Sequence, residues 1–164
     1  MIAYKFLSAG GVGRFTGFRW EAGRWVDAQK ADPCRTGVHA CRVRDLPLWL
    51  DDELWEIELD GEVVVGERKI VATRGRLTQR IDRWTPEVAR EFGRFCARRT
   101  RERVGFVPFL SGFVADVDRF VAQNRIAIAG FAAARAAELR DGEGGYEAER
   151  AAQASWLGSR LGLE

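Results

Sequence analysis

The stretch that decides the fold is LWEIELDGEVVV, residues 54–65. Its first half alternates: glutamates separate the apolar side chains of Trp55, Ile57 and Leu59, and a period of two is typical of a strand with one face in the core. Asp60-Gly61 follows, and this dipeptide between apolar runs favours a two-residue turn because both positions tolerate positive φ. We therefore predict a β-hairpin that Asp60-Gly61 closes, with the three apolar side chains facing the core.

Further strands are expected on both sides of this hairpin. We predict them at 2–7, at 37–42, as two short strands within 18–28, and at 68–72 and 76–81, with turns at Gly66 and Gly75. The glycine-rich segment 8–17 is expected to be a loop, and residues 43–52 one or two helical turns. The N-terminal half should thus form an antiparallel β-meander of about six or seven strands.

The C-terminal half carries helical signals instead. Thr85-Pro86 is typical of a helix start, because threonine caps the first turn and proline at the first helical position loses no hydrogen bond; this helix should reach about residue 103. A second helix is predicted from Ser111 to Arg140, with an apolar stripe of Val114, Val117, Val121, Ile128 and Phe131. A break is expected at 141–145, and a last helix at 146–161 that ends at Gly162.

These signals place the chain in the α+β class, with an antiparallel β-meander sheet in the N-terminal half followed by about three helices. The 164 residues suffice for one domain with a core of its own. We predict a single domain over 1–164, with a β-rich part at 1–83 and a helical part at 84–164. The only candidate boundary lies near Trp84, and the helical part is too rich in alanine to fold without the sheet.

Composition and charge exclude several classes of function. A net charge of +2 is too small for a nucleic-acid-binding surface. The longest apolar run, 104–114, is interrupted by glycine and proline and is shorter than the roughly 20 residues of a membrane span, and the first residues lack the apolar core of a signal peptide. Three cysteines form an odd set without a secretory signal, so we predict reduced thiols, no disulfide and a cytoplasmic protein.

The densest cluster of reactive residue types is Cys34, His39 and Cys41. Three such ligands can hold a catalytic zinc with water in the fourth position, but no Cys-x-x-Cys pair supports a metal site. The alternative is that both thiols are small buried apolar groups and that His39 is a hydrogen-bonded polar residue. We assign no metal ligand, and both interpretations of the cluster stay open.

His39 is the only histidine and a candidate general base or ligand donor. In an extended segment it shares one face with Cys41, while Val38 and Ala40 point to the other. A functional role requires His39 in a cleft; a structural role requires it buried with both ring nitrogens bonded. Trp20 is likewise either an aromatic wall for a bound base or sugar or a core side chain.

Part of the chain resembles a known family. The matching elements are Phe18-x-Trp20-Glu21-x-Gly23-x-Trp25, Cys34-x-x-Gly37-Val38-His39-Ala40-Cys41, Pro47, Glu56-Ile57-Glu58-Leu59-x-Gly61-Glu62 and Lys69-Ile70-Val71-Ala72. They resemble an uncharacterised domain of phage and bacterial proteins whose most specific element is C-x-x-G-[FV]-H-A-C. The similarity covers about residues 4–80, and the helical tail lies outside it. Because that family has no assigned activity, the resemblance implies a domain and not a reaction.

A looser likeness, at the level of fold alone, is to ADP-ribosyltransferase-like folds. Tyr4-Lys5, Gly37-Val38-His39 and Glu56 or Glu58 would take the places of the strands that carry the site in those folds. The first strand lacks the arginine or histidine usual there, and His39 does not match a serine motif.

We therefore expect a small-molecule- or nucleotide-binding protein with a pocket around the Gly37–Cys41 strand, and a transferase-like activity as an extension of that role. The candidate catalytic residues are His39 and Glu58, and the candidate ligand-binding residues are Tyr4, Lys5, Trp20 and Arg42. The alternative is a non-catalytic interaction module whose helical tail binds a protein partner or a second copy of the chain. The sequence indicates no particular cofactor and leaves open whether the protein is an enzyme.

Overall fold

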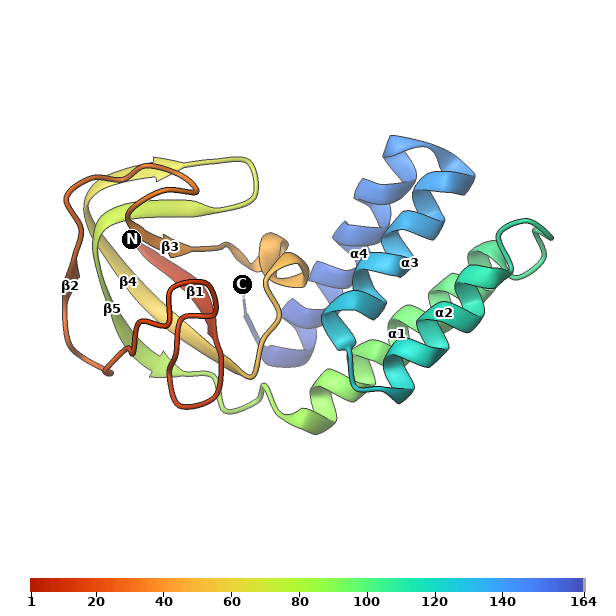
Figure 1. The fold of residues 1–164 in the computed structure, drawn as a ribbon, viewed down its shortest axis with the longest axis horizontal. Helices are drawn as coiled ribbons and strands as arrows, with labels where there is room; N and C mark the ends of the chain where they lie inside the picture. The colour runs from red at the N-terminus through yellow and green to blue at the C-terminus, as the bar shows by residue number, and fades with distance from the viewer. Residues whose placement is uncertain (164) are drawn as a thin grey trace. The chain divides into compact units, whose positions relative to one another are not determined.

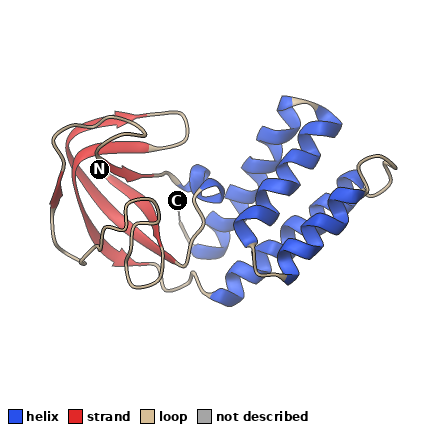
Figure 2. Cartoon of the chain, in the orientation of Figure 1, coloured by secondary structure: helices blue, strands red, loops and turns tan. Residues whose placement is uncertain are grey.

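The computed structural model describes residues 1–163. The chain divides into two compact units, Met1–Thr85 and Pro86–Glu164, close to the boundary considered at Trp84. The first unit is built around an antiparallel sheet (Figure 1) and the second is helical (Figure 2). The predicted α+β class is confirmed. No helix within residues 1–163 has the length and apolar sequence that crossing a membrane requires.

Five strands make the sheet of the first unit: β1 (Ile2–Leu7), β2 (Val26–Asp27), β3 (Val38–Ala40), β4 (Glu53–Val65) and β5 (Ile70–Arg80). All pairings are antiparallel, in the order β1-β4-β5-β2, and β3 also pairs with β5. Tyr4 and Cys41 exchange two backbone hydrogen bonds of 2.8 Å, which join the other edge of β1 to the residue after β3. The sheet therefore curls back on itself.

Apolar side chains from four of these strands fill the inside of the curled sheet. The cluster consists of Ala3, Leu7, Val38, Ala40, Ile57, Leu59, Ile70, Ala72 and Leu77, with the half-buried Trp20, Val26, Trp55 and Val63 packed against it. Each fully buried leucine, isoleucine or valine contributes roughly 1.5–3 kcal/mol relative to an exposed one. This cluster is therefore a principal source of stability in the first unit.

The predicted hairpin at Asp60-Gly61 is wrong, although the predicted core face is confirmed. β4 continues through these residues and pairs with β5 on both sides of them, with a shift in register between Asp60 and Val63. Gly61 has a φ of 74°, and because the two strands pair on both sides of it, it serves a β-bulge and not a turn. Ile57 and Leu59 are buried, as the alternation predicts. The turn lies further on, where the Gly66 N–H donates to the Lys69 oxygen at 2.9 Å.

The sheet has five strands instead of about six or seven because the predicted breaks are absent. β5 runs straight through Gly75. A Cβ at Gly75 would lie 2.7 Å from the Val38 side chain, so this glycine permits close packing and makes no turn. The segment 18–28 contains only β2, and the segment 43–52 contains one 3₁₀ helix, η1 (Val43–Leu48).

Four helices form the second unit, instead of about three: α1 (Pro86–Val104), α2 (Gly112–Ala122), α3 (Ile126–Asp141) and α4 (Glu143–Leu161). α1 begins at Pro86, and α4 ends at Gly162, whose φ of 68° completes a left-handed C-terminal cap. Both ends are as predicted. The expected break at 141–145 is confined to Gly142, which separates α3 from α4.

The predicted single helix from Ser111 to Arg140 is wrong, because residues 123–125 separate α2 from α3 and Asn124 adopts a φ of 56°. The predicted apolar stripe is divided with it. Val117 is fully buried, whereas Ile128 and Phe131 are 37% and 50% exposed. α3 instead buries its small residues, Ala129, Gly130, Ala132, Ala133, Ala134, Ala136 and Ala137, together with Ile126.

Candidate functional site

Lys5 lies on β1 between Ala3 and Leu7, the two residues of that strand that belong to the core cluster. Its ammonium donates a hydrogen bond of 2.7 Å to the backbone oxygen of His39 and lies 4.9 Å from the centre of the Trp20 ring. No acidic side chain of residues 1–163 pairs with it. The structure thus brings together three of the predicted site residues, with His39 contributing its backbone.

The surroundings of Lys5 disfavour its charge. Burial lowers the pKa of Lys5 from its ordinary 10.5 to about 8, because a low-dielectric environment destabilises an ammonium that no anion faces. The nearby Cys41 thiol is no counter-ion, since burial raises the pKa of Cys41 and keeps it neutral. The carbonyl oxygen and the aromatic ring compensate the charge only in part.

His39 is half-buried on β3, and both of its ring nitrogens have backbone partners. Nε2 lies 3.2 Å from the Cys34 nitrogen, and Nδ1 lies 3.0 Å from the Gly37 oxygen. Because the Cys34 N–H can only donate, Nε2 accepts and the ring proton resides on Nδ1. Burial, foremost, lowers the pKa of His39. The neutral ring therefore stabilises the turn at residues 34–37. Of the two roles predicted for His39, these contacts favour the structural one.

Glu58 and Tyr4 lie on the other face of the sheet from Lys5. Glu58 alternates with the buried Ile57 and Leu59 on β4 and accepts a hydrogen bond of 2.8 Å from Arg76. Tyr4 alternates with the core-facing residues of β1, and its backbone pairs with Glu56. The structure therefore does not bring these two predicted site residues to the Lys5 ammonium.

The Arg42 side chain connects two segments of the first unit through hydrogen bonds. Its Nε donates to the Asp45 carboxylate at 2.6 Å and its Nη2 donates to the Gly66 oxygen at 3.0 Å and to the Glu67 oxygen. These contacts tie the start of η1 to the turn between β4 and β5. The guanidinium therefore serves contacts within the protein, which disfavours its predicted role in ligand binding.

The cluster of Cys34, His39 and Cys41 does not assemble as a ligand set. Cys34 is exposed and Cys41 is buried. The Cys34 sulfur instead accepts a hydrogen bond of 2.6 Å from the Lys69 ammonium. Among the residues that the structure describes, no three side chains of metal-ligating type gather closely enough to hold an ion.

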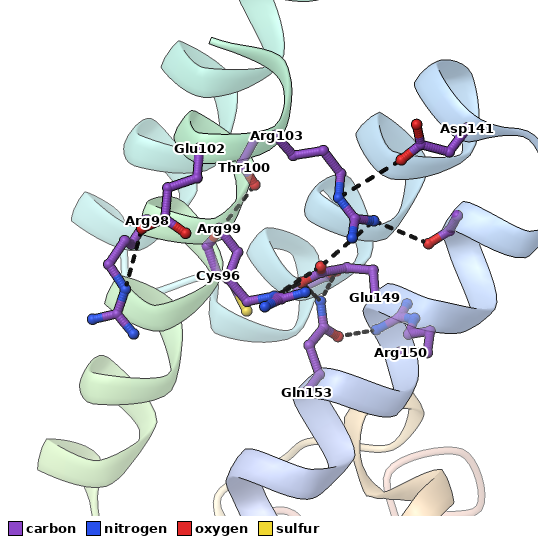
Figure 3. A network of polar contacts seen from close by, with 12 residues as sticks. Cys96, Arg98, Arg99, Thr100, Glu102, Arg103, Asp141, Glu149, Arg150 and Gln153 are labelled. Carbon is purple, nitrogen blue, oxygen red and sulfur yellow. Dashed lines mark hydrogen bonds and ion pairs between the residues drawn. The ribbon is translucent and has the colours of Figure 1, made fainter.

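Sequence reasoning missed a buried polar network in the helical unit. Glu149 and Gln153 of α4 are 2% and 0% exposed. Arg99 of α1 donates to both Glu149 carboxylate oxygens, at 3.1 and 2.9 Å, and Gln153 donates to the Gly130 oxygen of α3 at 3.0 Å. Figure 3 shows Arg99, Glu149 and Gln153 pointing toward one another between the helices.

The network links three helices of the second unit. Arg150 donates to Gln153 at 3.0 Å, and Arg103 lies 4.0 Å from Glu149 and donates to the Gly145 oxygen at 3.3 Å. A buried polar network whose members satisfy one another fixes how helices meet and offers little to a ligand. The signal in the sequence was the spacing of Glu149 and Gln153, four residues apart on the helix face that also buries Ala154, Leu157 and Leu161.

The chain matches no protein-family model, no curated protein and no solved structure. The resemblance over about residues 4–80 and the likeness to ADP-ribosyltransferase-like folds therefore stay predictions.

Proposed function

We propose that the first unit binds a small molecule or nucleotide through an anionic group, and that Lys5 supplies the charge that attracts it. One observation carries this proposal. The half-buried Lys5 ammonium has a carbonyl oxygen and an aromatic ring as neighbours, and no carboxylate of the described chain faces it.

The energetics of an unpaired ammonium support an anionic ligand. A charge partly removed from water without a counter-ion raises the free energy of the folded protein. A phosphate or carboxylate beside Lys5 would offset that cost, because a charge-assisted hydrogen bond contributes roughly 1.5–3 kcal/mol. Trp20 would offer an apolar face to a base or ring of the same ligand. This combination suits a nucleotide or another aromatic anion.

The contacts favour binding over catalysis. Both ring nitrogens of His39 are occupied by backbone groups, and Glu58 is paired with Arg76 on the other face of the sheet. Neither side chain is therefore placed to act as an acid or base on a molecule held at Lys5. We propose a binding role and no reaction.

Thermal unfolding in the presence of chosen ligands tests the proposal. We expect inorganic phosphate, AMP and NAD to raise the melting temperature of the wild-type chain, and adenosine, which carries no charge, to raise it less than AMP. A ligand present at 100 times its dissociation constant stabilises by about 2.7 kcal/mol. Lys5→Met should abolish the effect of all three anions, because methionine keeps the length of the side chain and removes its charge.

Lys30→Met is the matched control, since Lys30 is exposed and pairs with Asp32 at 2.9 Å. This variant should respond to AMP like the wild type. An AMP effect that survives in Lys5→Met would move the site away from Lys5, and the absence of any response to the three anions at millimolar concentration would contradict the proposal.

A second candidate function, protein association through the helical unit, is favoured by the segment between α1 and α2. Phe106 and Phe109 there are 94% and 80% exposed, and neighbouring exposed aromatic side chains are typical of interaction surfaces. Sedimentation velocity tests association with a second copy. A dimer that forms in the wild type and not in a Phe106→Ser, Phe109→Ser double variant supports the role; a monomer in both contradicts it.

A further inference from the structure

A thiol and an amine from distant parts of the first unit lie in contact. Cys34 belongs to the turn before β3, Lys69 directly precedes β5, and the Lys69 Nζ lies 2.6 Å from the Cys34 Sγ. Cys34 is exposed, so dissolved oxidants reach it. The thiol and the amine, once its ammonium has lost a proton, therefore form a pair of nucleophiles at the surface of the sheet unit.

The backbone and an aromatic ring hold the two partners in place. Cys34 adopts a φ of 69°, which is uncommon for a residue other than glycine, and its N–H donates to the ring of His39 at 3.2 Å. The Lys69 ammonium lies 5.8 Å from the centre of the Trp49 ring, and Trp49 donates to the Arg68 oxygen at 3.0 Å. The contact is thus built by the fold from both sides.

The separation of the two atoms is informative. A distance of 2.6 Å is short for a hydrogen bond to sulfur. It is close to the distance between two atoms bonded to the same third atom, such as N and C across a Cα, which is about 2.5 Å. One oxygen atom fits between Nζ and Sγ with little movement of either residue.

We propose that Cys34 and Lys69 form a reversible covalent bridge, Nζ–O–Sγ, on oxidation by hydrogen peroxide. One peroxide oxidises the thiol to a sulfenic acid. The Lys69 ammonium releases a proton to water, and a second peroxide oxidises the neutral amine to a hydroxylamine; each oxidation releases one water. The hydroxylamine oxygen then attacks the sulfenic sulfur and the sulfenic oxygen leaves as water. In sum, one amine, one thiol and two peroxides give the bridge and three waters, and nitrogen and sulfur lose two electrons each.

The rest of the chain makes this pairing selective. Cys41 and Cys96 are buried, and burial raises the pKa of each thiol, which lowers their reactivity. Lys5 donates to the His39 oxygen and Lys30 pairs with Asp32. Peroxide should therefore act first at Cys34, with Lys69 as the amine beside it.

Mass spectrometry of the full chain tests the bridge. After treatment of the folded protein with hydrogen peroxide we expect a product heavier by about 14 Da, for one oxygen gained and two hydrogens lost. Excess dithiothreitol should convert it back to the amine, the thiol and one water, with two dithiothreitol molecules oxidised for each bridge. Peptide mapping should place the added mass on linked peptides containing Cys34 and Lys69. It also separates this product from oxidation of Met1, the only methionine.

Matched variants decide the outcome. Lys69→Arg keeps the positive charge and should show oxidation of Cys34 without the bridge; Cys34→Ser should show neither; Lys30→Arg should bridge like the wild type. Thermal melts of each variant verify that it folds. The proposal fails if Cys34 in the wild type is oxidised without linkage to Lys69, if Lys69→Arg gives the same product, or if urea-unfolded protein bridges as readily as folded protein.

Discussion

At the scale of single residues, Lys5 is the most informative side chain. The ammonium of a lysine between two core residues of a strand needs a compensating partner, such as an anion, an aromatic ring or a carbonyl oxygen. The Lys5 ammonium has a carbonyl oxygen and an aromatic ring but no anion among residues 1–163. The same residue should therefore lower the stability of the free protein and create affinity for an anion. This coupling makes Lys5 testable without knowledge of the natural ligand.

Lys5 predicts a specific dependence of stability on pH. Its pKa is about 8 in the folded state and 10.5 when unperturbed, so between these pH values the unfolded chain binds more protons and stability rises with pH. Below pH 8 both states are charged and the penalty is complete, up to about 3 kcal/mol. Urea unfolding of wild type and Lys5→Met should show the variant more stable at pH 7 and the difference shrinking toward pH 10.5. A variant less stable than the wild type at pH 7 would contradict a charge penalty at Lys5.

His39 should behave as a structural residue. His39→Gln removes at least one of the two ring contacts with the backbone, and we expect a loss of about 2 kcal/mol in urea unfolding. The wild type should also lose stability as the pH falls below about 6.5, because the lowered pKa of folded His39 leaves the unfolded chain with more protons there. An unchanged midpoint in His39→Gln would return His39 to the list of ligand-binding candidates.

At the scale of elements, the bulge in β4 shows why a larger residue in place of Gly61 should destabilise the protein. Gly61 and Glu62 lie opposite Thr73, between the paired positions Asp60–Arg74 and Val63–Ala72. A Cβ on Gly61 would collide with the Thr73 hydroxyl. That hydroxyl cannot move freely, because it accepts the Glu62 N–H at 3.0 Å.

Gly61→Ala and Gly23→Ala form a matched pair for this bulge. Both glycines have positive φ, 74° and 78°, so both variants carry backbone strain of about 1–2 kcal/mol. Nothing lies within 4 Å of a Cβ at Gly23. We expect Gly61→Ala to cost at least about 1 kcal/mol more than Gly23→Ala in chemical denaturation, and equal costs would argue against the bulge.

The helical unit offers a similar comparison between α2 and α3. Val117 is fully buried, and Val117→Asp should cost about 3 kcal/mol or more because it buries an unpaired charge. Ile128, from the same predicted stripe, is 37% exposed, and Ile128→Asp should cost much less. Melting temperatures followed by circular dichroism measure both. Equal losses would favour the continuous helix that the sequence predicts.

The elements show which signals in the sequence are reliable. Period-two alternation identified the core face of β4, and terminal proline and glycine identified the start of α1 and the end of α4. Asp60-Gly61 misled because a turn and a bulge both need a residue with positive φ. Which one forms depends on whether β5 pairs beyond that point, and this is not encoded locally.

The candidate site was less predictable than the fold for the same reason. Trp20 was a candidate by residue type and Lys5 through the likeness to ADP-ribosyltransferase-like folds, and the structure places the two side chains together. The partners that occupy His39, Arg42 and Glu58 come from other segments, and single-residue reasoning does not reveal them. The contact of Lys69 with Cys34 likewise depends on the pairing of β3 with β5.

At the scale of the whole molecule, the question is whether the two units unfold together. The composition of the helical half predicts one domain, because a half so rich in alanine should not be stable alone, and α3 does bury mostly alanine. Five of the six tryptophans, Trp20, Trp25, Trp49, Trp55 and Trp84, lie in the first unit, and Trp156 lies in the second. Fluorescence therefore reports chiefly on the sheet unit, and ellipticity at the helical band reports on the helices.

We expect the two signals to change at the same urea concentration, as for a single cooperative domain. Val117→Asp, although it lies in α2, should then shift the fluorescence transition as much as the ellipticity transition. Separate midpoints, with only the ellipticity shifted in this variant, would show that the units are independent.

The pairing of β1 with β4 has a consequence for synthesis of the protein. Ile2 is opposite Glu58, whereas β4 and β5 are joined by a short turn. A ribosome must therefore synthesise the chain through β4 before β1 can form its ladder with that strand, although Tyr4 can pair with Cys41 earlier. The local hairpin of β4 and β5 forms soon afterwards. Until then the nascent chain exposes Ala3 and Leu7, and a chaperone that shields this first segment should raise the yield of folded protein.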